Sequence, residues 1–336
     1  MKKRVFVIVG AVVGIAVLGL AALGIAMATH APSASAATAC TATGYVRDGK
    51  NLTAALINPS GTVSGDLDAT GCDIGVFYGA GATGMVSGAD IHNAKYFGVV
   101  NDGGAVTVEN SRIHEIGESP FNGAQHGVAV YWVFGSAATG KIVNNTIWNY
   151  QKGGIAVNGV GSSATISGNT VTGLGPVSFI AQNGIQVGFG ATGTVMGNTV
   201  SDNSYTGTST QSGGILVAGG DCYGGPYTTD TEIVGNTVIN NDVGIWMSNI
   251  QGDCVSAPTT ATNIKVANNT ISNDAVNNGY VYQAGISDQG YNDKIVHNTI
   301  SGAGYGPEIT ATVYLIPIDA SGSFTNKVKV HANAVS

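Results

Sequence analysis

The side chains best suited to proton transfer are concentrated in one stretch of this chain, residues 90–132. The stretch holds three of the six histidines of the chain and one of its three arginines. A histidine gains and loses a proton near neutral pH, and an arginine keeps its charge and pairs with anions. The candidate catalytic residues are therefore Arg112, His114, Glu118 and His126, with acid–base chemistry on a bound substrate as their expected role.

Two of these histidines lie in similar local sequences. The segments ADIHNA, from residue 89, and SRIHEI, from residue 111, align with an offset of 22 residues. If they stack in a repeating fold, the rings of His92 and His114 lie about 5 Å apart. With Glu115 and Glu118 close in sequence, such a pair could share a metal ion or serve as a general acid and base. The alternative is a solvated pair on a turn.

The rest of the chain predicts how such segments could stack, because it repeats two short phrases. The first is Asn-Thr followed by Val or Ile, with the asparagines Asn145, Asn169, Asn198, Asn236, Asn269 and Asn298. The second is a glycine, an apolar residue, any residue and a final residue that is usually apolar, beginning at Gly75, Gly98, Gly127, Gly154, Gly184, Gly214, Gly244 and Gly285. Both phrases alternate with the period of two that is typical of strands, and no stretch after residue 40 has the pattern of a capped amphipathic helix.

Short strands that return at such intervals, with variable loops between them, predict a solenoid. The repeated asparagines are 24 to 38 residues apart. One repeat cannot bury its own apolar face, so the coils must stack at the strand spacing of about 4.8 Å. An asparagine at the same bend of every coil could then hydrogen-bond its neighbours above and below.

The combined pattern, I-x-x-N-T-[IV]-x-[ND]-x-x-x-G-[IV]-x-[VL], resembles the right-handed parallel β-helix repeat of the pectate-lyase-like superfamily over about residues 65–305. The resemblance implies an all-β fold, a right-handed single-stranded parallel β-helix solenoid of about eight to nine coils. We expect residues 37–64 to form a lead-in and N-terminal cap, and residues 306–336 to form a final strand and C-terminal cap. Because this fold hosts lyases, hydrolases, epimerases, tailspikes and adhesins, the resemblance predicts the fold rather than an activity.

The four cysteines are expected to form two disulfides. An even number in an exported chain, without a C-x-x-C pair, favours disulfides over a zinc site. Cys222 and Cys254 each follow the same repeat strand in neighbouring coils, which places their Cα atoms within bonding range. Cys40 and Cys72 would then tie the lead-in segment to the first coil and close the apolar end of the solenoid.

Enzymes of this superfamily suggest two further kinds of site. A pectate lyase holds calcium with several acidic residues, and Asp90, Asp102, Glu109 and Arg112 could imitate that set. The alternative is carboxylates that merely keep the protein soluble. No cofactor is therefore predicted, and calcium is the one candidate ion.

A hydrolase is the second kind of site that the superfamily suggests. QHGVAV, from residue 125, is similar to a histidine-glycine segment of polygalacturonase-like hydrolases. The Asn-Thr-Asp, Asp-Asp and Arg-Ile-Lys segments of that family are absent from this sequence. A hydrolase also needs two opposed carboxyl groups, so the sequence disfavours a hydrolase site at His126. We expect the His126 side chain to fill the entrance of a strand instead.

Outward positions of the glycine-phrase strands would carry a partly apolar stripe. Its predicted members, assigned as substrate-binding residues, are Tyr131, Gln186, Leu216 and Trp246. Aromatic side chains there could stack on sugar rings. The alternative is that the insertions at 219–232 and 249–262 cover the stripe.

The N-terminal segment has the features of an export signal. Lys2, Lys3 and Arg4 precede an uncharged apolar run, and small residues follow at 34–36. Residues 1–36 are therefore predicted to be a signal peptide, or an N-terminal membrane anchor, because the run is long enough to cross a bilayer. We expect a secreted or extracellular protein that contacts a membrane only through this segment.

Composition excludes one class of partner. The chain is 10% charged with a formal charge of −7, which becomes −10 when the three positive charges of residues 1–36 are removed. An acidic surface without a basic patch or phosphate-binding loop gives no support to a nucleic-acid partner. A polysaccharide or cell-surface glycan is the expected partner.

Two functions follow from these patterns. Since no catalytic motif is complete, the sequence favours a non-catalytic surface or glycan-binding scaffold. The alternative is a carbohydrate-active enzyme, a polysaccharide lyase rather than a hydrolase or epimerase, with its site around residues 90–132.

Overall fold

The computed structural model describes residues 39–279, 283–305, 311–315 and 326–336, within a compact unit that spans residues 37–336. The predicted signal or anchor at residues 1–36 lies outside the described residues. In the described part the regular elements are strands and two single-turn 3₁₀ helices, η1 (Asp221–Tyr223) and η2 (Ala303–Tyr305). No helix in this part has the length and apolar character needed to span a membrane.

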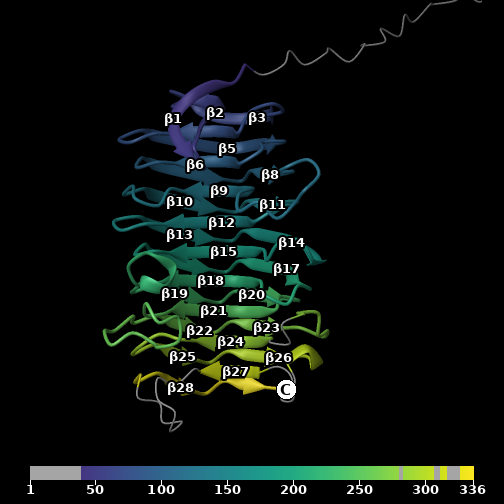
Figure 1. The fold of residues 1–336 in the computed structure, drawn as a ribbon, viewed down its shortest axis with the longest axis vertical. Helices are drawn as coiled ribbons and strands as arrows, with labels where there is room; N and C mark the ends of the chain where they lie inside the picture. Colours follow the sequence, from purple (N-terminus) through teal and green to yellow (C-terminus); the bar gives the residue numbers. More distant parts are fainter. Residues whose placement is uncertain (1–38, 280–282, 306–310, 316–325) are drawn as a thin grey trace, which may run out of the picture. The chain divides into compact units, whose positions relative to one another are not determined.

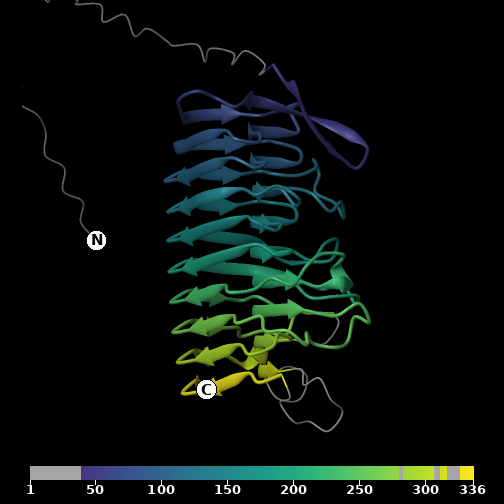
Figure 2. The same ribbon diagram turned by 90° about the vertical axis from the view of Figure 1, so that its left-hand side faces the viewer.

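The strands form three parallel columns, one strand of each column per coil (Figures 1 and 2). The first column, called sheet A here, consists of β2 (Lys50–Ile57), β4 (Ile74–Tyr78), β6 (Phe97–Asn101), β9 (Val128–Trp132), β12 (Gly153–Asn158), β15 (Asn183–Gly188), β18 (Gly213–Gly219), β21 (Val243–Asn249), β24 (Ala284–Asp288) and β27 (Ala311–Leu315). The all-β parallel solenoid expected from the repeat is therefore confirmed. The number of coils stays a prediction.

The other two columns belong to one continuous sheet. One column consists of β3 (Thr62–Asp68), β5 (Thr83–His92), β7 (Ala105–Glu109), β10 (Thr139–Val143), β13 (Ser163–Ser167), β16 (Thr192–Met196), β19 (Glu232–Val234), β22 (Lys265–Ala267), β25 (Lys294–Val296) and β28 (Lys329–His331). The other consists of β8 (Arg112–His114), β11 (Thr146–Trp148), β14 (Thr170–Val177), β17 (Thr199–Tyr205), β20 (Thr237–Ile239), β23 (Thr270–Ser272), β26 (Thr299–Ser301) and β29 (Ala334–Val335). The long strand β5 pairs with both β7 and β8, so it joins the two columns.

The interior is filled by aliphatic ladders that run along the axis of the solenoid. Ile155, Ile185, Ile215 and Ile245 pair in register on successive strands of sheet A, and all are fully or almost fully buried. Each buried residue packs on an equivalent residue in the next coil, so the hydrophobic contribution grows with each coil added.

The repeated asparagines form a buried ladder at one bend. Asn169 accepts hydrogen bonds at Oδ1 from the backbone N and the Nδ2 of Asn145, at 2.9 and 3.0 Å. It donates Nδ2 to Asn198 Oδ1 at 2.9 Å and to the carbonyl of Ile142 at 2.9 Å. The ladder continues beyond the predicted residues to Asn333. The asparagines therefore satisfy backbone groups at the bend that would otherwise be buried without partners.

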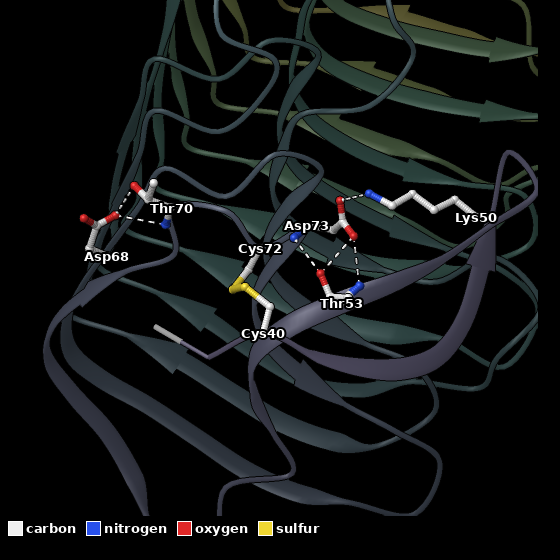
Figure 3. Close-up of a disulfide and its surroundings, with 7 residues drawn as sticks. All are labelled: Cys40, Lys50, Thr53, Asp68, Thr70, Cys72 and Asp73. Atoms are coloured by element: carbon white, nitrogen blue, oxygen red, sulfur yellow. Dashed lines mark hydrogen bonds and ion pairs between the residues drawn. A yellow bond between two sulfur atoms is a disulfide. The ribbon is translucent and has the colours of Figure 1, made fainter. Parts of the chain in front are cut away.

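A β-hairpin and a disulfide close the N-terminal end. Strand β1 (Thr41–Arg47) pairs antiparallel with β2, which already pairs in parallel with β4, so the sheet begins within the segment expected to be a lead-in. Figure 3 shows the predicted Cys40–Cys72 disulfide beside the hairpin. Cys72 is buried in the apolar core, so this bond ties the hairpin to the end of the solenoid.

The hairpin also covers the outer face of the first coils, which the sequence does not predict. Tyr45 of β1 stacks on Phe77, with ring centroids 6.4 Å apart. The guanidinium of Arg47 lies 5.6 Å from the ring centroid of Phe97 and 5.7 Å from that of Tyr131. These contacts belong to a second buried apolar cluster, outside the interior ladders.

The other predicted disulfide is confirmed, and two short strands lie near the C-terminus. Cys222 and Cys254 are bonded, with their Cα atoms 5.0 Å apart, and join the loops that follow β18 and β21. Strands β28 and β29 continue the two columns of the second sheet beyond β25 and β26. The residues 306–310 and 316–325 of the expected C-terminal cap lie outside the described part of the chain.

Candidate functional site

Three aromatic rings stack on the outer surface of the first coils. His92 ends β5, His114 ends β8 and Trp148 ends β11, and these strands pair in register. The rings of His92 and His114 are 5.3 Å apart and nearly parallel, and the rings of His114 and Trp148 are 4.2 Å apart. The stacked histidines predicted from the 22-residue offset are confirmed.

Carboxylates surround these histidines. His114 contacts Asp90 Oδ1 through Nε2 at 2.7 Å and the Glu115 carboxylate through Nδ1. Arg112 also reaches Asp90, at 3.3 Å, and its guanidinium lies 5.4 Å from the Trp148 ring centroid. Burial lowers the pKa of His114, and the hydrogen bond with Asp90 opposes that shift. Asp90 therefore positions two of the four candidate catalytic residues on the same coil.

The other two candidates form a separate group on the loop between β8 and β9. Glu118 Oε1 lies 3.0 Å from His126 Nε2, and Glu118 Oε2 lies 3.2 Å from Lys95 Nζ. His126 is buried and stacks on Tyr96, with ring centroids 3.8 Å apart. His126 thus fills the entrance to β9, as the sequence predicted.

The carboxyl group of Glu118 is held in its ionised form. Burial alone would raise the pKa of Glu118, but hydrogen bonds from Lys95 and His126 outweigh it, so the pKa is lowered. Burial lowers the pKa of His126, and Glu118 opposes this shift. At neutral pH Glu118 is therefore a carboxylate that can accept hydrogen bonds, and not a proton donor.

A cleft of about 650 Å³ joins the two groups. Glu115, which contacts His114, and Glu118, which contacts His126, both line it. Its wall also includes Thr70, Gly71, Cys72, Asn93, Lys95, Gly117, Ser119, Pro120 and Phe121. The cleft therefore combines hydrogen-bonding groups with one half-buried aromatic ring, Phe121. Such a lining can orient a polar ligand and also pack against its apolar face.

The sequence indicated the region of this cleft and two of its lining residues, Glu115 and Glu118. Phe121, which also lines it, was not among the candidates. The signal that could have indicated Phe121 is the length of the non-repeating segment between Ile116 and His126, since an insertion in a solenoid maps to a loop on one face.

The four residues proposed to imitate a calcium site do not form one group. Asp90 pairs with Arg112 and His114, whereas Glu109 Oε1 accepts a hydrogen bond from Ser87 at 3.1 Å on the neighbouring column. Among the described residues, no group of three or more His, Cys, Asp or Glu side chains is arranged to hold a metal. Calcium at this place remains a prediction from the sequence.

The predicted stripe lies on one face of sheet A. Gln186, Leu216 and Trp246 pair in register on β15, β18 and β21, and Tyr131 lies two strands before Gln186. Tyr131 is buried beneath Arg47, whose Nη1 donates to its hydroxyl at 3.3 Å. Gln186 and Trp246 are partly exposed. The cover over Tyr131 comes from the N-terminal hairpin, whereas the alternative drawn from the sequence placed such a cover in the insertions at 219–232 and 249–262.

This fold and cleft define a parallel β-helix with a loop-borne polar cleft near one end. The family model of the right handed beta helix region matches residues 54–171 and 133–319, and the chain belongs to this family. A comparison with curated proteins finds no match.

Two solved structures are similar to this chain at low levels. The Dettilon tailspike protein (gp208) is 12% identical, with a TM-score of 0.38 over 76% of this chain and 61% of the tailspike. The A-module of the Azotobacter vinelandii mannuronan C-5 epimerase AlgE4 is 13% identical, with a TM-score of 0.25 over 82% of this chain and 90% of the module. This chain thus spans about three fifths of the tailspike.

Proposed function

We propose that this protein is exported and binds a polysaccharide, without cleaving it, in the cleft beside Lys95, Glu118 and Phe121. The observation that carries this proposal is the lining of that cleft. Lys95 and Glu118 are fixed by their ion pair, and Phe121 supplies an apolar surface next to them. Sugars present hydroxyl groups at their edges and C–H groups on their faces, so they match a site that has both.

The electrostatics of the site favour binding over catalysis. Glu118 is ionised through its contacts with Lys95 and His126, and both ring nitrogens of His114 are engaged by Asp90 and Glu115. General acid catalysis needs a group that holds a proton near the working pH. Groups that are already paired with one another instead provide a rigid set of donors and acceptors.

Export is supported by the disulfides and by the N-terminal sequence. Two disulfides with no free cysteine among the described residues are typical of an oxidising compartment. The basic and apolar residues at the N-terminus predict the export route.

Affinity measurements on a panel of neutral and acidic polysaccharides test this function. We expect one class of glycan to bind, and Lys95→Ala and Phe121→Ala each to weaken binding by roughly tenfold, since a lost charge-assisted hydrogen bond or aromatic contact is worth about 1–2 kcal/mol. Lys141→Ala and Phe134→Ala are matched controls, because both residues are exposed and outside the cleft lining. An unchanged binding affinity in all four variants would refute the site, and the absence of binding to any glycan would refute the function.

A second candidate function is a carbohydrate-active enzyme, a lyase rather than a hydrolase or epimerase. The observation that favours it is the presence of His114, Glu115 and Glu118 at or beside one cleft, together with lysine and arginine side chains. Ultraviolet absorbance and reducing ends, followed on the same panel with and without calcium, detect it. Turnover that disappears in Arg112→Ala or His114→Ala would replace the non-catalytic proposal.

A further inference from the structure

The apolar ladders of the solenoid are interrupted near its C-terminal end by two carboxylates. In sheet A, Val187, Val217 and Met247 pair in register along one interior ladder, and all three are fully buried. The next position of that ladder is Asp288, which is also fully buried. A carboxylate thus stands where the preceding coils place an aliphatic side chain.

A second carboxylate occupies an interior position of the adjoining column. Lys265 pairs in register with Lys294 of the next coil. The residues just before them are Ile264, which belongs to the core, and Asp293. Asp293 therefore lies one coil beyond Ile264. Asp293 is fully buried, and its Oδ1 accepts hydrogen bonds from Thr262 Oγ1 and from the backbone N of Ile264, both at 2.7 Å.

Apart from the contact between the two carboxyl groups themselves, three oxygen atoms at this place are buried without a hydrogen-bond partner among the described residues. They are Asp288 Oδ2, Asp293 Oδ2 and Asn326 Oδ1. All three residues are fully buried, whereas most buried polar atoms in proteins are satisfied. Three such acceptors at one end of the solenoid make a bound cation a candidate partner for them.

The turn at Gly290 brings the three residues together. Asp288 Oδ1 accepts a hydrogen bond from the backbone N of Gly290 at 2.7 Å, and Asn326 Nδ2 donates to the Gly290 carbonyl at 3.2 Å. A methyl group at position 290 would lie 1.9 Å from Asp293 Oδ2, so that carboxylate also packs directly on the glycine. The three side chains that carry these oxygen atoms therefore all contact Gly290.

The two carboxylates lack a positive partner. Among the described residues no lysine, arginine or histidine forms an ion pair with Asp288 or Asp293. When both carboxyl groups are ionised, this buried pair needs a counter-charge.

We propose that Asp288, Asp293 and Asn326 form a buried site for a hard divalent cation of the calcium type. Carboxylate and amide oxygens are the ligands such cations use, and backbone carbonyls and water commonly complete the set. Because Asn326 follows β27 and precedes β28, an ion at this site links the last coil to the turn between β24 and β25. The site would thereby stabilise the C-terminal end of the solenoid, opposite the end that the hairpin covers.

The metal content and stability of the full chain test this proposal. We expect the purified protein to retain stoichiometric calcium, and we expect a chelator to lower its melting temperature and calcium at about 1 mM to restore it. Asp288→Asn and Asp293→Asn keep the side-chain shape, and each should raise the dissociation constant for calcium by at least roughly tenfold, since the number of charged ligands sets affinity. Asp230→Asn is the matched control, because Asp230 is exposed and lies outside the site.

The rival explanation is a carboxyl pair that shares one proton. It predicts no retained metal, no response to chelator, calcium, magnesium or manganese, and variants at Asp288 or Asp293 that are as stable as the parent or more stable. That combination would overturn the proposal. If both variants fail to fold, the response of the unmodified chain to chelator and calcium still decides between the two explanations.

Discussion

The imidazole of His114 lies face to face with the indole of Trp148, 4.2 Å away, while its edge contacts Asp90 at 2.7 Å. His92 and Trp148 stack on the two faces of the imidazole, and the carboxylates of Asp90 and Glu115 contact its nitrogens. Burial lowers the pKa of His114 against the opposing effect of Asp90. The unfolded chain therefore takes up this proton first as the pH falls, and stability that is fully present above about pH 6.5 declines below it.

His114→Gln should make this decline shallower. The variant cannot take up the proton, so the unfolding midpoint should fall less between about pH 7 and pH 5 than in the parent. The measurement is the midpoint of urea unfolding at a series of pH values, with His331→Gln, at the exposed C-terminal end, as the control. Identical slopes for the parent and His114→Gln would show that this histidine does not couple folding to pH.

The asparagine ladder predicts a large local effect from a small change. Asn198 accepts from the backbone N and the Nδ2 of Asn169, and donates to Asn236 Oδ1 and to the Ile166 carbonyl. Asn198→Ala leaves these buried groups unpaired, so we expect a loss of at least about 2 kcal/mol in the free energy of unfolding. Thr199→Ala, at the exposed neighbouring residue, should cost less than about 0.5 kcal/mol. Equal effects of the two changes would contradict the role of the ladder.

The two disulfides should differ in their effect although they close loops of equal length. Both join residues 32 positions apart, so the chain-entropy contribution of each is equal, between about 3 and 5 kcal/mol. Cys40–Cys72 also ties the hairpin to the buried core, whereas Cys222–Cys254 joins two surface loops.

Replacing both cysteines of a pair by alanine, one pair at a time, separates these contributions. We expect loss of Cys40–Cys72 to lower the melting temperature more and to expose apolar surface that binds a hydrophobic dye. Loss of Cys222–Cys254 should mainly increase proteolysis in the loops that follow β18 and β21. A larger fall in melting temperature for the second pair would contradict the assignment of the first as the cap.

The Lys50–Asp73 pair should hold the hairpin on the solenoid. Asp73 is almost fully buried and accepts hydrogen bonds from Lys50 Nζ at 2.5 Å and from the backbone N of Thr53 at 2.9 Å, as Figure 3 shows. Burial alone would raise the pKa of Asp73, but hydrogen bonds from Lys50 and Thr53 lower it. The stability that this pair contributes is thus present above about pH 4 and is lost as the pH falls through the lowered pKa of Asp73.

Lys50→Ala should cost about 1 kcal/mol, because the lysine is half exposed and solvent screens the pair. Hydrogen exchange at neutral pH should show faster exchange in β1 and β2 and unchanged exchange in β12 and β15. Lys141→Ala, an exposed lysine on β10, is the control. Unchanged protection of the hairpin in Lys50→Ala would mean that the disulfide and apolar contacts alone hold it.

The sequence alone determined the repeating part of this protein. The asparagine ladder, the His92–His114 stack and the Cys222–Cys254 disulfide were predictable because each depends on contacts between neighbouring coils, and Cys40–Cys72 followed as the remaining pair. In a solenoid a fixed phrase places equivalent residues directly above one another, so spacing along the chain converts into position in space.

The tertiary structure decided what the repeat does not constrain. The contact between Arg47 and Tyr131, which are 84 residues apart, depends on the direction in which the hairpin folds. The separation of Arg112 and His114 from Glu118 and His126 depends on the path of an insertion between β8 and β9. No periodicity acts on hairpins and loops, so packing and hydrogen bonding formed only in the folded chain fix their positions.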